Sequence, residues 1–355
     1  MFEALIYKKL KNQSVQCRVC QRRCFINEGK TGFCSTKLNS KGKLYSLNYG
    51  RVQGIQVDPI EKKPFYHFRP GSLVPSVGSF GCNFRCKQCL NFRYSWGEPA
   101  SLILKRATEY DFLQAADHNE IIKEIVKNNY SGIAFTYNEP VIWVEYVLAL
   151  AKAAKHKKLF TLFVTNGSWT KETLDKIGPF IDAANIDFKG FSEKTYQKMG
   201  GFFGQIPEMA KYAQTKHNIH LEITTLLIPG INDSPKELKQ MAEWIVKELG
   251  PKTPWHLSRY DPFLAPDFDF QKILPTTISG LKKAKKIGQI AGLEFIYIWA
   301  PGNDLKNGVY SEGDTRCPNC GKLAVSRQFW KPAIIGVDKN GNCLFCQEGL
   351  NLKLK

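Results

Sequence analysis

The sequence predicts an α/β fold with a parallel sheet, flanked at both ends by cysteine-rich segments. Between about Leu73 and Pro301, short β-branched and aromatic runs alternate with longer helical patterns. The eleven cysteines fall into groups of four, three and four along the chain. Strands alternating with helices form βα units and build an open or closed barrel. We therefore predict an N-terminal four-cysteine segment with its lead-in (1–70), a barrel (71–301) and a C-terminal module (302–355).

Each expected strand is a short apolar run bounded by polar or turn-forming residues. These strands lie at 73–77, 132–137, 159–165, 184–188, 220–228, 255–260 and 293–298. Helical patterns fill intervals between them, at 110–128, 141–156, 170–177, 234–249 and 276–291. Ser234, followed by Pro235 and by Glu237, predicts a capping box at the start of the fourth helix.

Polar or glycine-containing residues follow nearly every expected strand. In parallel βα architectures the reactive groups gather at the carboxyl ends of the strands. Any one of these segments is compatible with an ordinary loop, because loops are generally polar. Five such segments follow five of the expected strands, and the first of them carries three cysteines. Together they favour one shared site at one end of a barrel.

The middle cysteines, Cys82, Cys86 and Cys89, predict a different chemistry from the other two groups. Four thiolates saturate a zinc ion or hold a complete iron–sulfur cluster. Three thiolates leave one iron of a [4Fe–4S] cluster without a protein ligand, so that iron can bind a small molecule. Lone cysteines are usually small buried hydrophobes, but scattered core residues would not divide into three compact groups.

The flanking cysteines predict two further metal sites. Cys317, Cys320, Cys343 and Cys346 form two CxxC pairs separated by 22 residues, which is typical of a zinc ribbon. An auxiliary iron–sulfur cluster is the alternative there. The N-terminal group is less regular, and zinc and iron–sulfur both remain open for it; its members are Cys17, Cys20, Cys24 and Cys34.

Composition places the chain among globular proteins. Fifty Lys and Arg against 32 Asp and Glu give a net charge of +18, and the hydrophobic fraction of 43% excludes wholesale disorder. Residues 1–11 contain no apolar stretch of the secretory type, and no run approaches about 18 apolar residues. We therefore expect a cytoplasmic protein without membrane association, whose cysteines bind metal rather than form disulfides.

The segment from Gly81 to Cys89 resembles the CxxxCxxC motif of radical S-adenosylmethionine (SAM) enzymes. Further segments resemble one branch, the AmmeMemoRadiSam-system radical SAM enzymes, which are relatives of pyruvate-formate-lyase-activating enzyme. These segments lie at 29–34, 49–51, 57–68, 136–140, 165–167, 187–189, 227–233 and 255–259. The resemblance implies a partial (β/α)6-type barrel, a [4Fe–4S] cluster on Cys82, Cys86 and Cys89, and bound SAM.

By position, the resemblance also implies residues that contact SAM. Glu139 would accept the SAM ammonium group, and Lys189 would supply a cation for the methionyl carboxylate. The full set of cofactor-binding candidates is Asn138, Glu139, Thr165, Asn166, Asp187, Lys189 and His256. Two positions depart from the pattern: Gln88 replaces an aromatic residue near the adenine, and the sixth strand offers His256 and Asp261 without a clear match.

The expected activity is reductive cleavage of SAM to a 5′-deoxyadenosyl radical that abstracts hydrogen from an unidentified substrate. That substrate could be a protein, as in glycyl-radical activation, and the expected electron donor is a flavodoxin or ferredoxin. The family partner proteins are further candidates for interaction. The alternative is a zinc-ribbon protein that binds nucleic acid or modifies RNA through its basic surface. Lysine runs on predicted helices are more often solvated faces, so we do not expect nucleic acid as a partner. A degenerate, inactive member is disfavoured by the intact cysteine motif.

Overall fold

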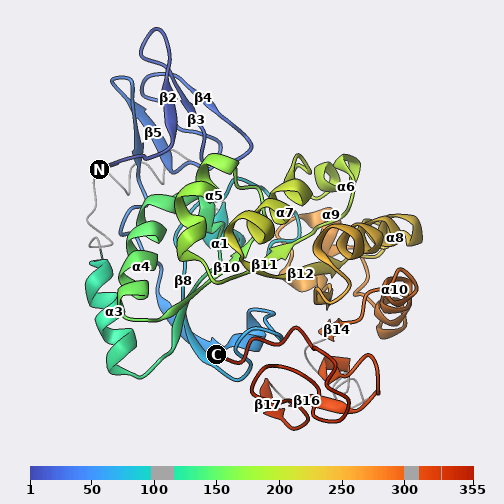
Figure 1. Ribbon diagram of the computed structural model, residues 1–355. Coiled ribbons are helices and arrows are strands. Elements are labelled where there is room, and N and C mark those ends of the chain that lie inside the picture. The colour runs from blue at the N-terminus through green and yellow to red at the C-terminus, as the bar shows by residue number, and fades with distance from the viewer. Residues whose placement is uncertain (97–115, 300–311, 329) are drawn as a thin grey trace. The chain divides into compact units, whose positions relative to one another are not determined.

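The computed structural model describes residues 1–96, 116–299, 312–328 and 330–355 (Figure 1). The chain divides into two compact units. The first comprises Met1–Val57, Val74–Ala184 and Gly200–Ile219, and the second comprises Asp58–Leu73, Asn185–Met199 and His220–Lys355. Three strands lie where the chain passes from one unit to the other: β7 (Ile55–Pro59), β8 (Leu73–Val77) and β11 (Ala183–Asp187).

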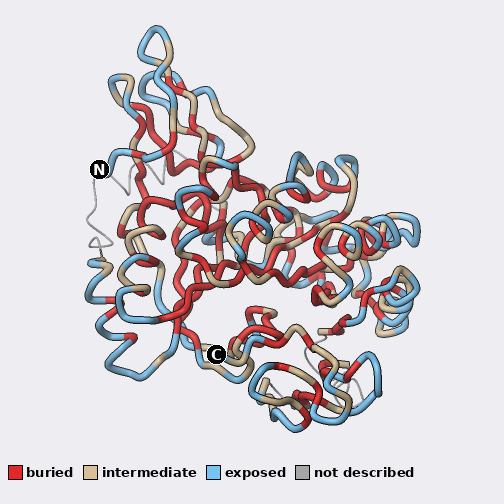
Figure 2. Tube along the Cα trace, viewed as in Figure 1, coloured by how far each residue is buried: buried red, intermediate tan, exposed pale blue. Residues whose placement is uncertain are grey.

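The first unit contains a parallel α/β layer. Strands β8, β9 (Gly132–Phe135) and β10 (Phe160–Thr165) lie side by side in chain order and run parallel. Figure 2 shows these strands largely buried. The helical segments of this unit are α1 (Phe92–Ser95), α3 (His118–Lys127), η2 (Pro140–Trp143), α4 (Val144–His156), α5 (Lys171–Ile177), η3 (Gly178–Phe180) and α7 (Ile206–His217). Helix α4 packs against β9 and β10, because its apolar face, including Val147, Leu150 and Ala154, is fully buried.

Two small antiparallel sheets precede this layer in the first unit. Their strand orders are β1-β6-β5 and β2-β3-β4. The strands are β1 (Phe2–Glu3), β2 (Tyr7–Lys9), β3 (Val15–Cys17), β4 (Phe25–Ile26), β5 (Lys37–Ser40) and β6 (Lys43–Ser46). They carry the N-terminal four-cysteine group.

The second unit contains a parallel run and a C-terminal antiparallel sheet. Strands β12 (His220–Leu227), β13 (Trp255–Arg259) and β14 (Ile296–Trp299) pair in chain order. The antiparallel sheet is built from β15 (Thr315–Arg316), β16 (Leu323–Gln328) and β17 (Lys331–Ile334). The helical segments are η1 (Ile60–Lys62), α6 (Glu193–Lys198), α8 (Pro235–Trp244), a π-helical turn η4 (Ile245–Leu249), η5 (Pro262–Leu264), α9 (Phe268–Gln271) and α10 (Ile278–Ile290).

The lysines near residue 285 lie on the outer face of helix α10. Its buried face consists of Leu281, Ala284 and Gly288, so the intervening lysines point outward. A Cβ atom at Gly288 would lie 2.6 Å from Ile296 Cδ1, which shows how closely the helix approaches β14. Lys285 pairs with Glu312 at 2.7 Å. This lysine run is therefore a partly ion-paired helix face, as the sequence predicted, and it provides no specific support for nucleic-acid binding.

The α/β prediction is confirmed, with local differences. All seven expected strands occur within three residues of their predicted limits. The expected helix at 110–128 is observed as His118–Lys127, and its residues 110–115 lie outside the described residues. The capping box is wrong: Ser234 is the N-cap of α8 but makes no side-chain capping bond. Glu237 instead accepts hydrogen bonds from Phe191 N at 2.5 Å and Thr195 Oγ1 at 2.8 Å, so its carboxylate is already occupied. The three-part division of the chain stays a prediction.

Within the described residues, no helix is both long and apolar enough to span a membrane.

A buried ion pair fixes the β1-β6-β5 sheet to helix α4. Lys37 Nζ on β5 contacts Glu145 Oε2 on α4, and both side chains are almost completely excluded from solvent. Lys37 also donates to Ser46 Oγ at 2.9 Å, and Glu145 Oε1 accepts from Leu5 N at 3.2 Å. Each charge thus has a second polar partner, which offsets the cost of its burial.

We predict that Lys37→Met lowers the free energy of unfolding by about 3–5 kcal/mol, because it leaves the Glu145 carboxylate buried without its cation. Urea denaturation of the metal-loaded protein measures this change. Lys43→Met is the matched control, since Lys43 pairs with Glu3 at an exposed site worth about 0–1 kcal/mol. A Lys37→Met variant as stable as this control would contradict the assigned role.

Candidate functional site

The loop after β8 brings Cys82, Cys86 and Cys89 into one short segment. Phe84 N donates to Cys82 Sγ at 3.4 Å, and Cys89 N donates to Cys86 O at 3.1 Å. Burial, reinforced by the neighbouring Cys86 and Glu139, raises the pKa of Cys82 well above its usual value. A thiol in such surroundings ionises only when a metal compensates the charge. The donor set therefore fits a [4Fe–4S] cluster with three protein ligands.

Asn138 holds this cysteine loop in place. Its Oδ1 accepts a hydrogen bond from Ser79 N at 3.1 Å, and its Nδ2 donates to Gly81 O at 3.0 Å. Gly81 has φ +84°, and a Cβ atom there would lie 2.6 Å from the Cys34 carbonyl oxygen. The sequence predicted that Asn138 binds the cofactor, and the structure places its amide group on the backbone of the cluster loop.

Glu139 lies at the end of β9 and is joined to the end of β10. Its Oε1 accepts from Thr165 Oγ1 at 2.7 Å and from Val141 N at 3.1 Å. Its Oε2 accepts from Asn166 N at 2.8 Å. Three of the predicted site residues, Glu139, Thr165 and Asn166, are therefore in direct contact beside the cysteine loop. A carboxylate oriented by several donors in this way can accept the ammonium group of a ligand.

A polar network that sequence reasoning missed continues from Asn166. Asn166 Nδ2 donates to Asn83 Oδ1 at 2.9 Å, and Asn83 Nδ2 donates to Ser168 Oγ at 2.6 Å. The Ser168 hydroxyl in turn donates to Asn166 Oδ1 at 2.5 Å. The sequence offered one indication of this network: Asn83 directly follows Cys82, and Ser168 directly follows the Thr-Asn-Gly segment.

Gln88 provides a second sign that the cysteine loop faces a ligand. Its side chain is only 6% exposed, yet Oε1 has no hydrogen-bond partner among the described residues. A buried amide oxygen without a partner costs about 1–3 kcal/mol. A ligand that donates a hydrogen bond, such as the amino group of an adenine, would satisfy it.

The other predicted SAM contacts belong to the second unit. Lys189 Nζ lies 3.2 Å from Asp187 Oδ2, directly after β11. Asn232 Nδ2 donates to Lys189 O at 2.8 Å and so fixes this segment. The structure thus pairs Asp187 with Lys189, and their contact with SAM stays a prediction.

His256 lies in a buried network around Glu222. His256 Nε2 is 2.7 Å from Glu222 Oε2. The same carboxylate accepts backbone hydrogen bonds from Tyr66, His67 and Phe68, at 2.8 to 3.2 Å. Burial alone would raise the pKa of Glu222, but hydrogen bonds from His220 and His256 lower it well below the usual value. The structure therefore occupies Nε2 of His256 with a protein carboxylate, which is a structural contact.

The C-terminal cysteines form a compact ligand set. Cys317 Sγ lies 3.5 Å from Cys346 Sγ, and Cys320 Sγ lies 3.6 Å from Cys343 Sγ. All four sulfurs lie within 4.8 Å of one another. Backbone N–H groups of Phe345 and Cys346, which outweigh the effect of burial, lower the pKa of Cys343 to about 7. Thiolates about 2.3 Å from one zinc ion stand about 3.8 Å apart, so this spacing suits a single tetrahedral metal.

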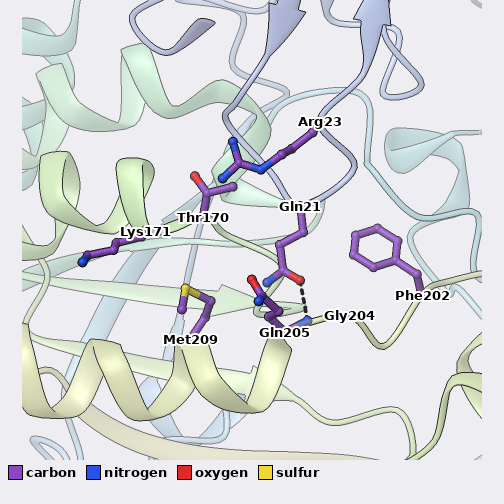
Figure 3. A pocket seen from close by; sticks show the side chains of 8 residues that line it. All are labelled: Gln21, Arg23, Thr170, Lys171, Phe202, Gly204, Gln205 and Met209. Carbon is purple, nitrogen blue, oxygen red and sulfur yellow. Dashed lines mark hydrogen bonds between the residues drawn. The ribbon is translucent and has the colours of Figure 1, made fainter.

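A cavity of about 360 Å³ lies beside the turn that follows Cys20 (Figure 3). Gln21 points into it, and its Oε1 accepts from Gln205 N at 2.7 Å while its Nε2 donates to Trp169 O at 3.0 Å. Arg23 is held by both carboxylate oxygens of Glu172, each at 3.0 Å. Because these polar groups already have protein partners, we assign no ligand to this cavity.

Comparison with known proteins assigns the chain to a family. A family model described as the radical SAM superfamily matches residues 76–245. An uncharacterized protein of Methanocaldococcus jannaschii is 34% identical over 356 residues, which cover the whole of both chains. A second protein of that organism, provisionally named as a glycyl-radical enzyme activating enzyme, is 28% identical over 47% of this chain and 60% of its own.

Two solved structures resemble the chain at lower sequence identity. A domain of pyruvate-formate lyase-activating enzyme from Bacteroides vulgatus has a TM-score of 0.39 and 20% identity, over 48% of this chain and 99% of that one. A radical SAM methyltransferase from Sphaerobacter thermophilus has a TM-score of 0.47 and 12% identity, over 73% and 71%. The matched model covers β8 to α8, including the three-cysteine loop and Glu139. From the matched model and the full-length relative, we conclude that this chain is an enzyme of the radical SAM superfamily.

Proposed function

We propose that this enzyme cleaves SAM at a [4Fe–4S] cluster held by Cys82, Cys86 and Cys89. When bound, the cluster and SAM together supply one-electron cleavage of the C5′–S bond, which yields methionine and a 5′-deoxyadenosyl radical that takes hydrogen from the substrate. The observation that carries the proposal is the contact set of Glu139, Thr165 and Asn166 beside the loop of three cysteines, of which Cys86 is buried and the other two are half-buried.

Each residue of this set has a role in binding or orientation. Glu139 accepts the SAM ammonium group, and Thr165 and Asn166 fix the direction of its two oxygens. Asn138 positions the cysteine loop through Ser79 and Gly81. Gln88 contributes the acceptor for the adenine amino group, in place of an aromatic contact. Asp187 and Lys189 serve the methionyl carboxylate. Glu222 occupies Nε2 of His256, so a contact of His256 with SAM would use Nδ1, which has no hydrogen-bond partner among the described residues.

The substrate class is a finer part of the proposal. The chain is similar to a protein provisionally named as a glycyl-radical enzyme activating enzyme, which supports hydrogen abstraction from a protein glycine. Membership of the AmmeMemoRadiSam branch stays a prediction, which rests on the resemblance of the segment 57–68. A ferredoxin or flavodoxin as electron donor and a cytoplasmic location stay predictions.

The C-terminal cysteines are proposed to hold zinc. Their short sulfur–sulfur distances support one tetrahedral ion, and two of them, Cys317 and Cys343, belong to the local hydrophobic core. The ion would therefore stabilise the β15-β16-β17 module rather than take part in the reaction.

We predict that Cys86→Ala abolishes formation of 5′-deoxyadenosine. The anaerobically reconstituted protein is reduced with dithionite in the presence of SAM, and the nucleoside is quantified. The variant should lose about four irons per chain and keep its zinc, which controls for folding. A wild-type protein with a verified [4Fe–4S] cluster that forms no 5′-deoxyadenosine would refute the proposal.

Glu139→Gln should weaken SAM binding by about tenfold or more, because hydrogen bonds to charged groups contribute about 1.5–3 kcal/mol. Equilibrium binding of SAM to the iron-loaded protein measures the loss, and iron content should not change. Glu208→Gln, on the exposed face of α7, is the control. Equal affinities of the two variants would remove Glu139 from the SAM site.

Cys320→Ser should remove about one zinc per chain and leave iron and SAM cleavage unchanged, because this group closes a structural site. Metal analysis by mass spectrometry tests this expectation. Loss of iron in place of zinc would show that the C-terminal group holds a cluster.

A further inference from the structure

Three of the four N-terminal cysteines are buried, and the fourth, Cys24, is half-buried. Cys17 lies at the end of β3, Cys20 and Cys24 lie in the turn that follows, and Cys34 lies before β5. Cys17 N donates to Cys24 O at 2.9 Å, which closes this turn. Each of the four thiols interacts electrostatically with at least two of the others. The four thiols therefore lie close enough to influence one another's charge.

Their spacing differs from that of the C-terminal group. Among the described residues, which include all eleven cysteines, the C-terminal four form the one group gathered as for a single metal ion, with all four sulfurs within 4.8 Å of one another. Neither the N-terminal four nor Cys82, Cys86 and Cys89 form such a group. Sulfurs that bind different irons of one cluster stand farther apart than sulfurs around a single ion. In this respect the N-terminal group resembles the cluster loop and not the zinc-type site.

The N-terminal group packs directly on the cluster loop. Arg22 Nε donates to Asn83 O at 2.5 Å, and Arg85 Nη2 donates to Phe33 O at 2.8 Å. The tight approach of Gly81 to the Cys34 carbonyl, described above, belongs to the same interface. The two cysteine groups are therefore separated by little more than the loop backbone.

Asn83 connects the two groups through its side chain. Its side chain lies near the Cys20 thiol and lowers the pKa of that thiol, although burial raises this pKa more strongly. Its Oδ1 also lies 3.9 Å from Cys82 Sγ. One buried amide therefore contacts a thiol of each group, and such a contact is a short path for electron transfer.

Two arginines balance the negative charge that two clusters would bring. Arg22 interacts electrostatically with Cys20, Cys24, Cys34 and Cys82, and its guanidinium lies 3.5 Å above the Phe33 ring. Arg85 interacts with Cys82, Cys34 and Cys86. Positive charge near the sulfurs raises the reduction potential of a cluster. The arginines would also offset the charge of a zinc ion on four thiolates, but such an ion has no redox potential for them to raise.

We propose that Cys17, Cys20, Cys24 and Cys34 hold a second iron–sulfur cluster that passes electrons to the cluster on Cys82, Cys86 and Cys89 through Asn83. A one-electron donor protein of the ferredoxin or flavodoxin class reduces the second cluster. That cluster returns to its oxidised state when it transfers the electron, so no bond forms or breaks at the N-terminal site. The inference rests on the proposed function, since the transferred electron is the one that SAM cleavage consumes.

The test compares wild type with Cys24→Ser, at the most exposed of the four cysteines. Wild type should contain about eight irons and one zinc per chain, and its reduced form should give two interacting signals in electron paramagnetic resonance. Cys24→Ser should lose about four irons and one signal. It should still cleave SAM with dithionite, yet slow by at least tenfold with a reduced ferredoxin.

Arg22→Gln is the second variant, in case Cys24→Ser does not fold. It should keep both clusters and shift the potential of the second cluster to a more negative value, whereas exposed Arg93→Gln should not. Four irons and two zincs in a wild type that cleaves SAM would overturn this inference and leave the proposed function intact. Eight irons without SAM cleavage would overturn the proposed function instead.

Discussion

The hydrogen bonds from Asn138 to the loop after β8 are the contact on which the candidate site depends. Three cysteines on one short loop can share a cluster only if the loop backbone is fixed before the metal binds. Asn138 fixes it from the segment after the neighbouring strand β9, through Ser79 N and Gly81 O. The next residue, Glu139, is consequently held beside the same loop and reaches Thr165 and Asn166 at the end of β10. Three parallel strands in register thus place the ligands and the carboxylate together.

The charges of the first unit are arranged so that burial is tolerated. Lys37 and Glu145 pair inside the protein, and each has a further hydrogen-bond partner. Arg22 and Arg85 lie among thiols that would be anionic once they bind metal. In the second unit, Glu222 carries its charge because backbone N–H groups and two histidines surround it. In each case the buried charge is balanced locally, which low-dielectric surroundings require.

The sequence allowed the fold class and the cysteine groups to be predicted because both depend on short-range patterns. Strand β10 is a β-branched and aromatic run, and the three-cysteine loop spans only eight residues. Helix α7 was missed because its buried face at Ile206, Ala210 and Ala213 consists largely of small residues with a weak apolar signal. The contact of Asn83 with Ser168 and the contacts of Glu222 with residues 66–68 join distant segments, and no local pattern indicates them. The contact of His256 with Glu222 was missed for the same reason, since only the fold brings the two residues together.

The central claim is that the cluster on Cys82, Cys86 and Cys89 has an open iron to which SAM binds. Electron paramagnetic resonance of the reduced protein, recorded with and without SAM, tests this most directly. The account predicts that SAM changes the g values of one [4Fe–4S] signal, and that this signal is absent from Cys86→Ala. A signal unaffected by saturating SAM would show that no iron of the cluster is open to it, and would contradict the account.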